Sequence, residues 1–152
     1  MFWRIEKLYY DTKLKIRRFF TRGIKGYDKS DLWDIDSWFI EIMPRMLREF
    51  KAQNNGHPCE LTMEDWNNIL DRMIYCFEEA DDVKCSQQNE WEDTFEIDSI
   101  MDYNDNSFHL IAHPQENWEK WTERDLEISK YREERLNEGL ELFKKYFREL
   151  WW

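Results

Sequence analysis

The chain has 152 residues, of which 17% are aromatic and 36% charged, and its formal net charge is −11. Disordered acidic segments lack aromatic residues, so this composition predicts a folded domain. The overall acidity argues against direct nucleic-acid binding, which needs a clustered basic surface. No apolar run approaches the roughly 18 residues of a membrane-spanning helix, so we expect no membrane partner.

Three cysteines, Cys59, Cys76 and Cys85, are an odd number without close pairing. They argue against a disulfide framework and predict reduced thiols. The first residues include Arg4 and Lys7, where a signal peptide would need an apolar stretch. We therefore expect a cytoplasmic protein.

The first third of the chain predicts two amphipathic helices. Residues 2–21 place apolar side chains loosely at helical spacing with basic residues between them. After a turn that contains two glycines, Ser30 is the expected N-cap of a second helix, whose apolar residues run to Phe50 at steps of three and four. Pro44 lies inside this pattern, so we expect a kink or a break near Met43.

A third helix follows the loop at residues 54–58. Thr62 and Asp65 have the spacing of a capping box, and one apolar face continues to Phe77. The acidic run at residues 78–82 is unfavourable at a helix C-terminus, so we expect fraying or a partner there.

Residues 83–124 show no sustained period and are expected to form an irregular acidic insert. Residues 92–98 alternate in part, and residues 107–113 fit a short strand or one helical turn. A final helix is expected from about Leu126, where Gly139 would permit close approach of another helix. The sequence therefore predicts one mainly α domain over residues 1–152, a bundle of about four principal helices with a short β element.

One candidate site lies at the junction of the first two helices. Asp36 falls on or beside an apolar stripe, where a carboxylate needs a partner, and neighbouring arginines are available. One interpretation is a structural ion pair between the helices. The other is a ligand pocket. Its lining would be Arg17, Arg18, Arg22, Trp33 and Asp36.

A second candidate site is the acidic block with its aromatic residues. Nine tryptophans exceed what a core of this size would enclose. The candidate partner-binding residues are Glu90, Trp91, Glu92, Asp93, Trp118 and Trp121. Such a surface would imitate a phosphate backbone and occupy a basic cleft of another protein. The alternatives are a solvated loop and aromatic packing within a bundle or a homodimer.

His109 and His113 are four residues apart and, with other donors, would form a zinc site on a helix. The other donors are His57, Cys59, Cys85 and Glu116. The spacing has neither the HExxH pattern nor paired CxxC motifs, so we expect no metal and no cofactor.

Several motifs resemble a family of small acidic proteins encoded by tailed bacteriophages. They are Arg22-Gly23, Gly26-Tyr27 with Asp31, Trp33 and Asp36, Asn55-Gly56-His57-Pro58, and Glu138-Gly139-Leu140 with Leu142-Phe143, Tyr146-Phe147 and Leu150-Trp151. The resemblance covers about residues 15–79 and 130–152 and implies expression in the cytoplasm of a bacterial host during infection.

Three hypotheses follow for function. The first is a non-enzymatic binding protein that inhibits a host factor, such as an antiviral defence component, by protein–protein contact. The second is a sponge that sequesters a nucleotide immune signal. The third is a metal-dependent hydrolase that uses His109 and His113. The aromatic C-terminus also favours a homodimer.

Overall fold

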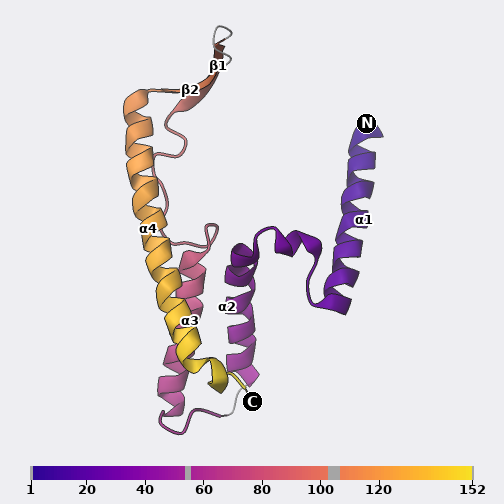
Figure 1. Ribbon diagram of the computed structural model, residues 1–152, viewed down its shortest axis with the longest axis vertical. Coiled ribbons are helices and arrows are strands. Elements are labelled where there is room, and N and C mark those ends of the chain that lie inside the picture. The colour runs from indigo at the N-terminus through magenta and orange to yellow at the C-terminus, as the bar shows by residue number, and fades with distance from the viewer. Residues whose placement is uncertain (1, 54–55, 103–106, 152) are drawn as a thin grey trace. The chain divides into compact units, whose positions relative to one another are not determined.

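Figure 1 shows the computed structural model, which describes residues 2–53, 56–102 and 107–151. The elements are α1 (Phe2–Lys25), a 3-10 turn η1 (Lys29–Leu32), α2 (Ile35–Gln53), α3 (Met63–Ala80), β1 (Glu96–Asp102), β2 (Ser107–His113), α4 (Gln115–Tyr146) and η2 (Phe147–Glu149). The prediction of a mainly α fold with four helices and a short β element is confirmed. No helix in the described ranges is both long and apolar enough to cross a bilayer.

The chain divides into two compact units, Met1–Phe39 and Ile40–Trp152. The sequence predicts one domain over residues 1–152. The boundary between them falls within α2.

In the first unit, α1 extends four residues beyond the predicted end at residue 21 and includes Gly23. The helix stops at Gly26, whose φ of 80° lies in the left-handed region that glycine adopts without strain. The Gly26 N–H donates to the carbonyl of Arg22 at 2.8 Å. The conformation of Gly26 therefore sets the helix end.

Ser30 does not cap a long helix, which corrects the predicted start of the second helix. Asp28 caps η1 instead: its carboxylate accepts a 3.1 Å bond from the Ser30 N–H, and the Asp28 N–H donates to Asp31 at 2.7 Å. These reciprocal bonds close a tight turn, so α2 begins only at Ile35. Of the expected kink or break near Met43, the break is wrong, because α2 continues past Pro44, whose ring is fully buried.

The second unit is built around α3. The predicted capping box is confirmed, because the Asp65 N–H donates to the Thr62 hydroxyl at 3.1 Å and the Thr62 N–H donates to the Asp65 carboxylate at 3.3 Å. The predicted apolar face supplies most of the core. Its fully buried members include Trp66, Leu70, Met73 and Phe77.

α4 packs along α3 through aromatic contacts and one glycine. The rings of Phe77 and Phe143 lie 6.3 Å apart, and those of Trp66 and Tyr146 lie 5.5 Å apart. A Cβ at Gly139 would lie only 3.0 Å from the Cβ of Cys76. The expectation that Gly139 permits close approach of another helix is confirmed.

Glu78 at the end of α3 and Asp81 just after it have partners within the chain. Arg48 of α2 forms an ion pair with Glu78. The Asp81 carboxylate accepts bonds from the Val83 N–H at 2.9 Å and from the Lys84 N–H at 3.3 Å. These bonds order the turn that follows α3 and offset the unfavourable charge at its C-terminus.

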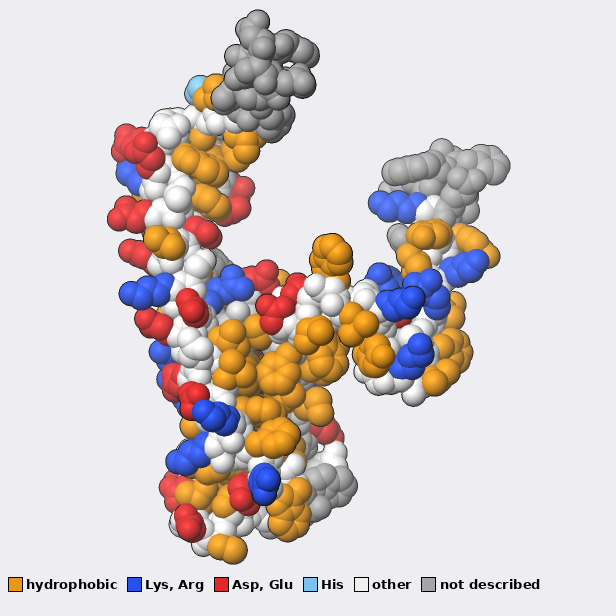
Figure 2. All heavy atoms as spheres, viewed as in Figure 1, with side chains coloured by type: hydrophobic (Ala, Val, Ile, Leu, Met, Phe, Trp, Pro, Cys, Tyr) orange, Lys and Arg blue, Asp and Glu red, His pale blue; other side chains and the backbone are white. Residues whose placement is uncertain are grey.

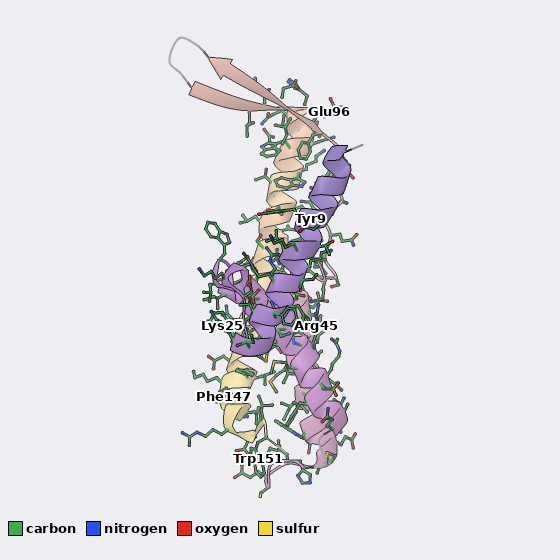
Figure 3. All side chains as sticks on the ribbon, turned by 90° about the vertical axis from the view of Figure 1, so that its right-hand side faces the viewer. Tyr9, Lys25, Arg45, Glu96, Phe147 and Trp151 are labelled. Carbon is green, nitrogen blue, oxygen red and sulfur yellow. The ribbon has the colours of Figure 1, made fainter. Side chains whose placement is uncertain are left out.

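The expected irregular insert is shorter than predicted. β1 and β2 pair as an antiparallel hairpin, with Glu96 opposite His113. Figure 3 labels Glu96 where β1 begins. α4 then starts at Gln115 and not near Leu126. The reason is that the early turns of α4 pack against residues 89–95, a contact that periodicity alone does not reveal.

Candidate partner-binding surface

We define the acidic aromatic surface as Glu90, Trp91, Glu92, Asp93 and Phe95 of the loop before β1, together with Trp118 and Trp121 of α4. Three hydrogen bonds hold this loop on the helix. The Asn89 side-chain amide donates to the Trp121 carbonyl at 2.9 Å, and the Asn117 side-chain amide donates to the Thr94 carbonyl at 2.9 Å. The Trp121 indole N–H donates to the Glu92 carboxylate at 2.6 Å. The loop therefore has a defined position on α4.

The loop is also folded on itself. The Trp91 N–H donates to the Asn89 side-chain oxygen at 3.1 Å, and the Thr94 hydroxyl donates to the Trp91 carbonyl at 2.7 Å. Short polar side chains that bond to nearby backbone stabilise turns in this way.

The aromatic residues form one half-buried cluster. Trp118 and Trp121 are three apart on α4, so their rings lie on the same side of the helix and stack with centroids 5.1 Å apart at 19°. Phe95 meets both edge-on, at 5.2 Å and 5.8 Å. This packing buries part of each ring and leaves the rest of its surface exposed, where another protein can contact it.

Charged residues surround the cluster. The Lys120 ammonium lies 4.8 Å from the centre of the Trp91 ring and also pairs with Glu116, which lowers the pKa of that carboxyl below its usual range. The Arg124 guanidinium lies 3.3 Å from Glu90 and 3.0 Å from Glu127. Lys120 therefore connects the Trp91 ring of the loop with α4, and Arg124 connects the Glu90 carboxylate with α4.

Acidic residues greatly outnumber basic ones in this part of the chain. Residues 78–127 contain 16 acidic and 3 basic side chains, a net charge of −13. Glu90, Glu92 and Asp93 are exposed, and Asp93 forms no ion pair within the described ranges. Figure 2 shows acidic and hydrophobic side chains beside one another along the upper part of α4. The surface thus combines negative potential with apolar area.

All six residues predicted for partner binding lie on this surface. Phe95 also lies on this surface, although the sequence does not predict it as a contact residue. Asn89 and Asn117 hold the loop on α4 and are likewise not predicted. The sequence around an asparagine in a polar loop does not indicate which backbone carbonyl its side chain will bind.

The arginine-rich candidate site has a different arrangement from the one expected. The Arg22 guanidinium donates to both carboxylate oxygens of Asp31, with a 3.0 Å bond from its Nε, and Arg18 lies 3.9 Å from Asp28. The Arg22 hydrogen bond and the Asp28 N–H lower the pKa of Asp31 to about 2. The prediction that Asp36 is the carboxylate bound by these arginines is therefore corrected to Asp31 and Asp28.

The other predicted residues of that site lie on the surface. Trp33 is 93% exposed, and Asp36 is also exposed. Asp36 lies beside Asp34, and hydrogen bonds from Asp36 and Ser37 lower the pKa of Asp34. The reason for the difference is the 3-10 turn, which places Asp28 and Asp31, and not Asp36, against the end of α1.

The candidate metal ligands are not assembled by the residues that the structure describes. No group of three or more His, Cys, Asp or Glu side chains within the described ranges is arranged to hold a metal ion. The His113 Nε2 lies 3.8 Å from the Asp98 carboxylate. Cys59 is exposed and Cys85 is buried. The side chain of His109 lies outside the described part.

No protein-family model, curated protein or solved structure matches this chain.

Proposed function

We propose that this protein is a non-enzymatic binding protein of bacteriophage origin that inhibits a host factor, such as a component of antiviral defence, by protein–protein contact. The acidic aromatic surface is the contact region. The partner is a protein with a basic surface, of the kind used to bind nucleic acid. The observation that carries the proposal is the placement of exposed carboxylates beside the half-buried Phe95, Trp118 and Trp121 cluster.

The physical properties of this surface suit that role. Aromatic residues at the centre of an interface supply most of the binding energy, while surrounding carboxylates steer a basic partner and exclude acidic ones. The hydrogen bonds between the loop and α4 fix the surface before binding, so less conformational entropy is lost on association.

The nucleotide sponge stays an alternative prediction without a structural observation in its favour, because Arg22 is already bonded to Asp31. A stoichiometric thermal shift with one nucleotide, without turnover, would support it.

The proposal is tested by native mass spectrometry of the tagged protein purified from its bacterial host. We expect a host protein in fixed stoichiometry. Asp93→Lys with Asp125→Lys should abolish this capture while the helix content by circular dichroism stays that of wild type. Asp93 is exposed, and Asp125 is an exposed residue one turn beyond Trp121 on the same face of α4. Neither carboxylate holds the loop in place, whereas Glu90 and Glu92 do.

The matched control is Glu133→Lys with Glu134→Lys, which makes the same charge change at exposed positions farther along α4. The control should retain the partner. Equal capture by both double variants would refute the role of this surface, and a wild-type protein without any partner would refute the inhibitor proposal.

A further inference from the structure

The helix α1 carries an exposed apolar face. Its members Tyr9, Ile16, Phe19, Phe20 and Ile24 are between 53% and 83% exposed. At about 100° per residue, Tyr9, Ile16 and Phe20 lie within an arc of about 40°, and Phe19 borders them. Exposed apolar area of this size and continuity is typical of a protein interface.

The same helix is strongly basic. α1 contains eight basic and two acidic residues, a net charge of +6. On the same projection Lys13 lies between Phe20 and Ile24, and Lys15 lies beside Phe19 at the edge of the apolar face. A partner for this face therefore needs apolar area flanked by negative charge.

The second unit of the chain has these properties. Residues 40–152 contain 13 basic and 27 acidic side chains, a net charge of −14. Most of this excess falls in residues 78–127, where the acidic aromatic surface also supplies half-buried rings. Charge and apolar character thus match those of α1.

We propose that α1 of one copy of this chain binds the acidic aromatic surface of a second copy, so that two copies form a reciprocal homodimer. Contact between two α1 helices would bring together two helices that each carry a net charge of +6, and contact between two acidic aromatic surfaces would bring together two negative surfaces. Repulsion between like charges disfavours both pairings. Reciprocal contact satisfies both surfaces and closes with twofold symmetry. A 24-residue helix is about 36 Å long, enough to cover the loop and several turns of α4.

The proposed homodimer needs no host factor, so the purified protein alone is sufficient to test it. The test is sedimentation velocity of the full chain at about 0.1 M and about 1 M salt, between which the Debye length falls from about 10 Å to about 3 Å. We expect a dimer at low salt and a dissociation constant at least about tenfold larger at high salt.

Two charge-reversed proteins identify the surfaces. The first carries Lys13→Glu with Lys15→Glu, and the second carries Asp93→Lys with Asp125→Lys. Each protein alone should dimerise more weakly than wild type, because the net charge of α1 falls from +6 to +2 in the first and that of residues 78–127 changes from −13 to −9 in the second. An equimolar mixture should form a heterodimer, because both of its contacts are again between opposite charges. Glu133→Lys with Glu134→Lys is the control and should remain dimeric.

A monomeric wild-type protein, a dissociation constant that Lys13→Glu with Lys15→Glu leaves unchanged, or a mixture that associates no more tightly than the first variant alone would each overturn the homodimer. Binding of α1 to anionic phospholipid vesicles by a monomeric wild-type protein would assign the face to a membrane instead. The α1 variant keeps the acidic aromatic surface intact. Its capture of a host factor therefore reports on the proposed function separately from self-association.

Discussion

The indole N–H of Trp121 donates a 2.6 Å hydrogen bond to the carboxylate of Glu92, which lies 29 residues earlier in the chain. This bond joins the loop before β1 to α4. Glu92 therefore has a structural role in addition to its negative charge. The carboxylate that contributes to the negative potential of the surface also holds the loop on α4.

Replacement of Glu92 by Ala should release the loop from α4. The Glu92→Ala and Trp121→Phe variants each remove one side of the hydrogen bond, and their double-mutant cycle should give a coupling energy of about 1 kcal/mol, since the bond is partly exposed to solvent. Urea unfolding measures the energies, and amide exchange of Thr94 should become faster in both single variants.

Glu92→Gln is the control, because its amide oxygen still accepts the indole N–H. It should retain most of the amide protection although it removes the charge. Additive effects of Glu92→Ala and Trp121→Phe would show that the bond does not hold the loop.

Gly139→Ala should destabilise the second unit. The new methyl group would lie 3.0 Å from the Cβ of Cys76 and 3.2 Å from the ring of Phe77. The Cys76 Cβ is fixed to the backbone of α3, so the helices must separate, at a cost of about 1–3 kcal/mol that exceeds the roughly 1 kcal/mol gain in helix propensity. Thermal unfolding measures the change.

Gly23→Ala is the matched control, because no atom lies within 4 Å of a Cβ at Gly23. This substitution should increase the helicity of α1 by circular dichroism. An unchanged or raised melting temperature for Gly139→Ala would show that α3 and α4 can separate without loss.

Glu79→Ala should also destabilise the second unit, by about 1 kcal/mol, because it leaves partly buried donors without this acceptor. The Glu79 carboxylate accepts from the Ser86 hydroxyl at 2.7 Å, the Ser86 N–H at 3.1 Å and the Tyr131 hydroxyl at 3.0 Å. Burial acts to raise the pKa of Glu79, but these hydrogen bonds outweigh it and the pKa lies below its usual value.

The pH dependence of stability follows from the lowered pKa of Glu79. A carboxyl whose pKa is lower in the folded state stabilises the fold above its unfolded pKa, near 4.5, and the contribution is lost as pH falls through the folded value. The free energy of unfolding, measured in urea, should therefore fall more on acidification for the wild-type protein than for Glu79→Gln. Parallel pH profiles for the two proteins would contradict this role.

The helices and the capping box were predictable because they depend on local signals. Thr62 and Asp65 are three residues apart, and the apolar residues of α3 repeat at helical spacing, so no distant contact is needed to recognise them. The core role of Gly139 was also predictable, since a glycine within a helix weakens it unless packing requires one.

The site was only partly predictable because its contacts are distant in sequence. Trp118 and Trp121 lie on one helix face, but the bond from Asn89 to the Trp121 carbonyl, which helps to determine where the loop lies, joins residues 32 apart in the chain. Asp31 directly follows Ser30, the expected N-cap, and this position is typical of an acidic residue in the first turn of a helix. Its bond to Arg22 depends on the turn at Gly26, whose geometry the sequence did not specify.

Arg22→Lys should raise the pKa of Asp31 from about 2 toward its usual 3.8, because lysine cannot form the paired bonds of a guanidinium. Since the pKa of Asp31 is lower in the folded state, its contribution to the order of the turn is present above about 3.8 and is lost as pH falls through about 2. Carboxyl chemical shifts followed by NMR from about pH 7 to pH 1.5 measure the pKa directly. Asp65 is the internal control: the Thr62 hydroxyl lowers its pKa without an arginine, so its titration should not change. An Asp31 titration that is the same in both proteins would show that the capping turn, and not Arg22, sets this pKa, and the ion pair would then not be what joins α1 to η1.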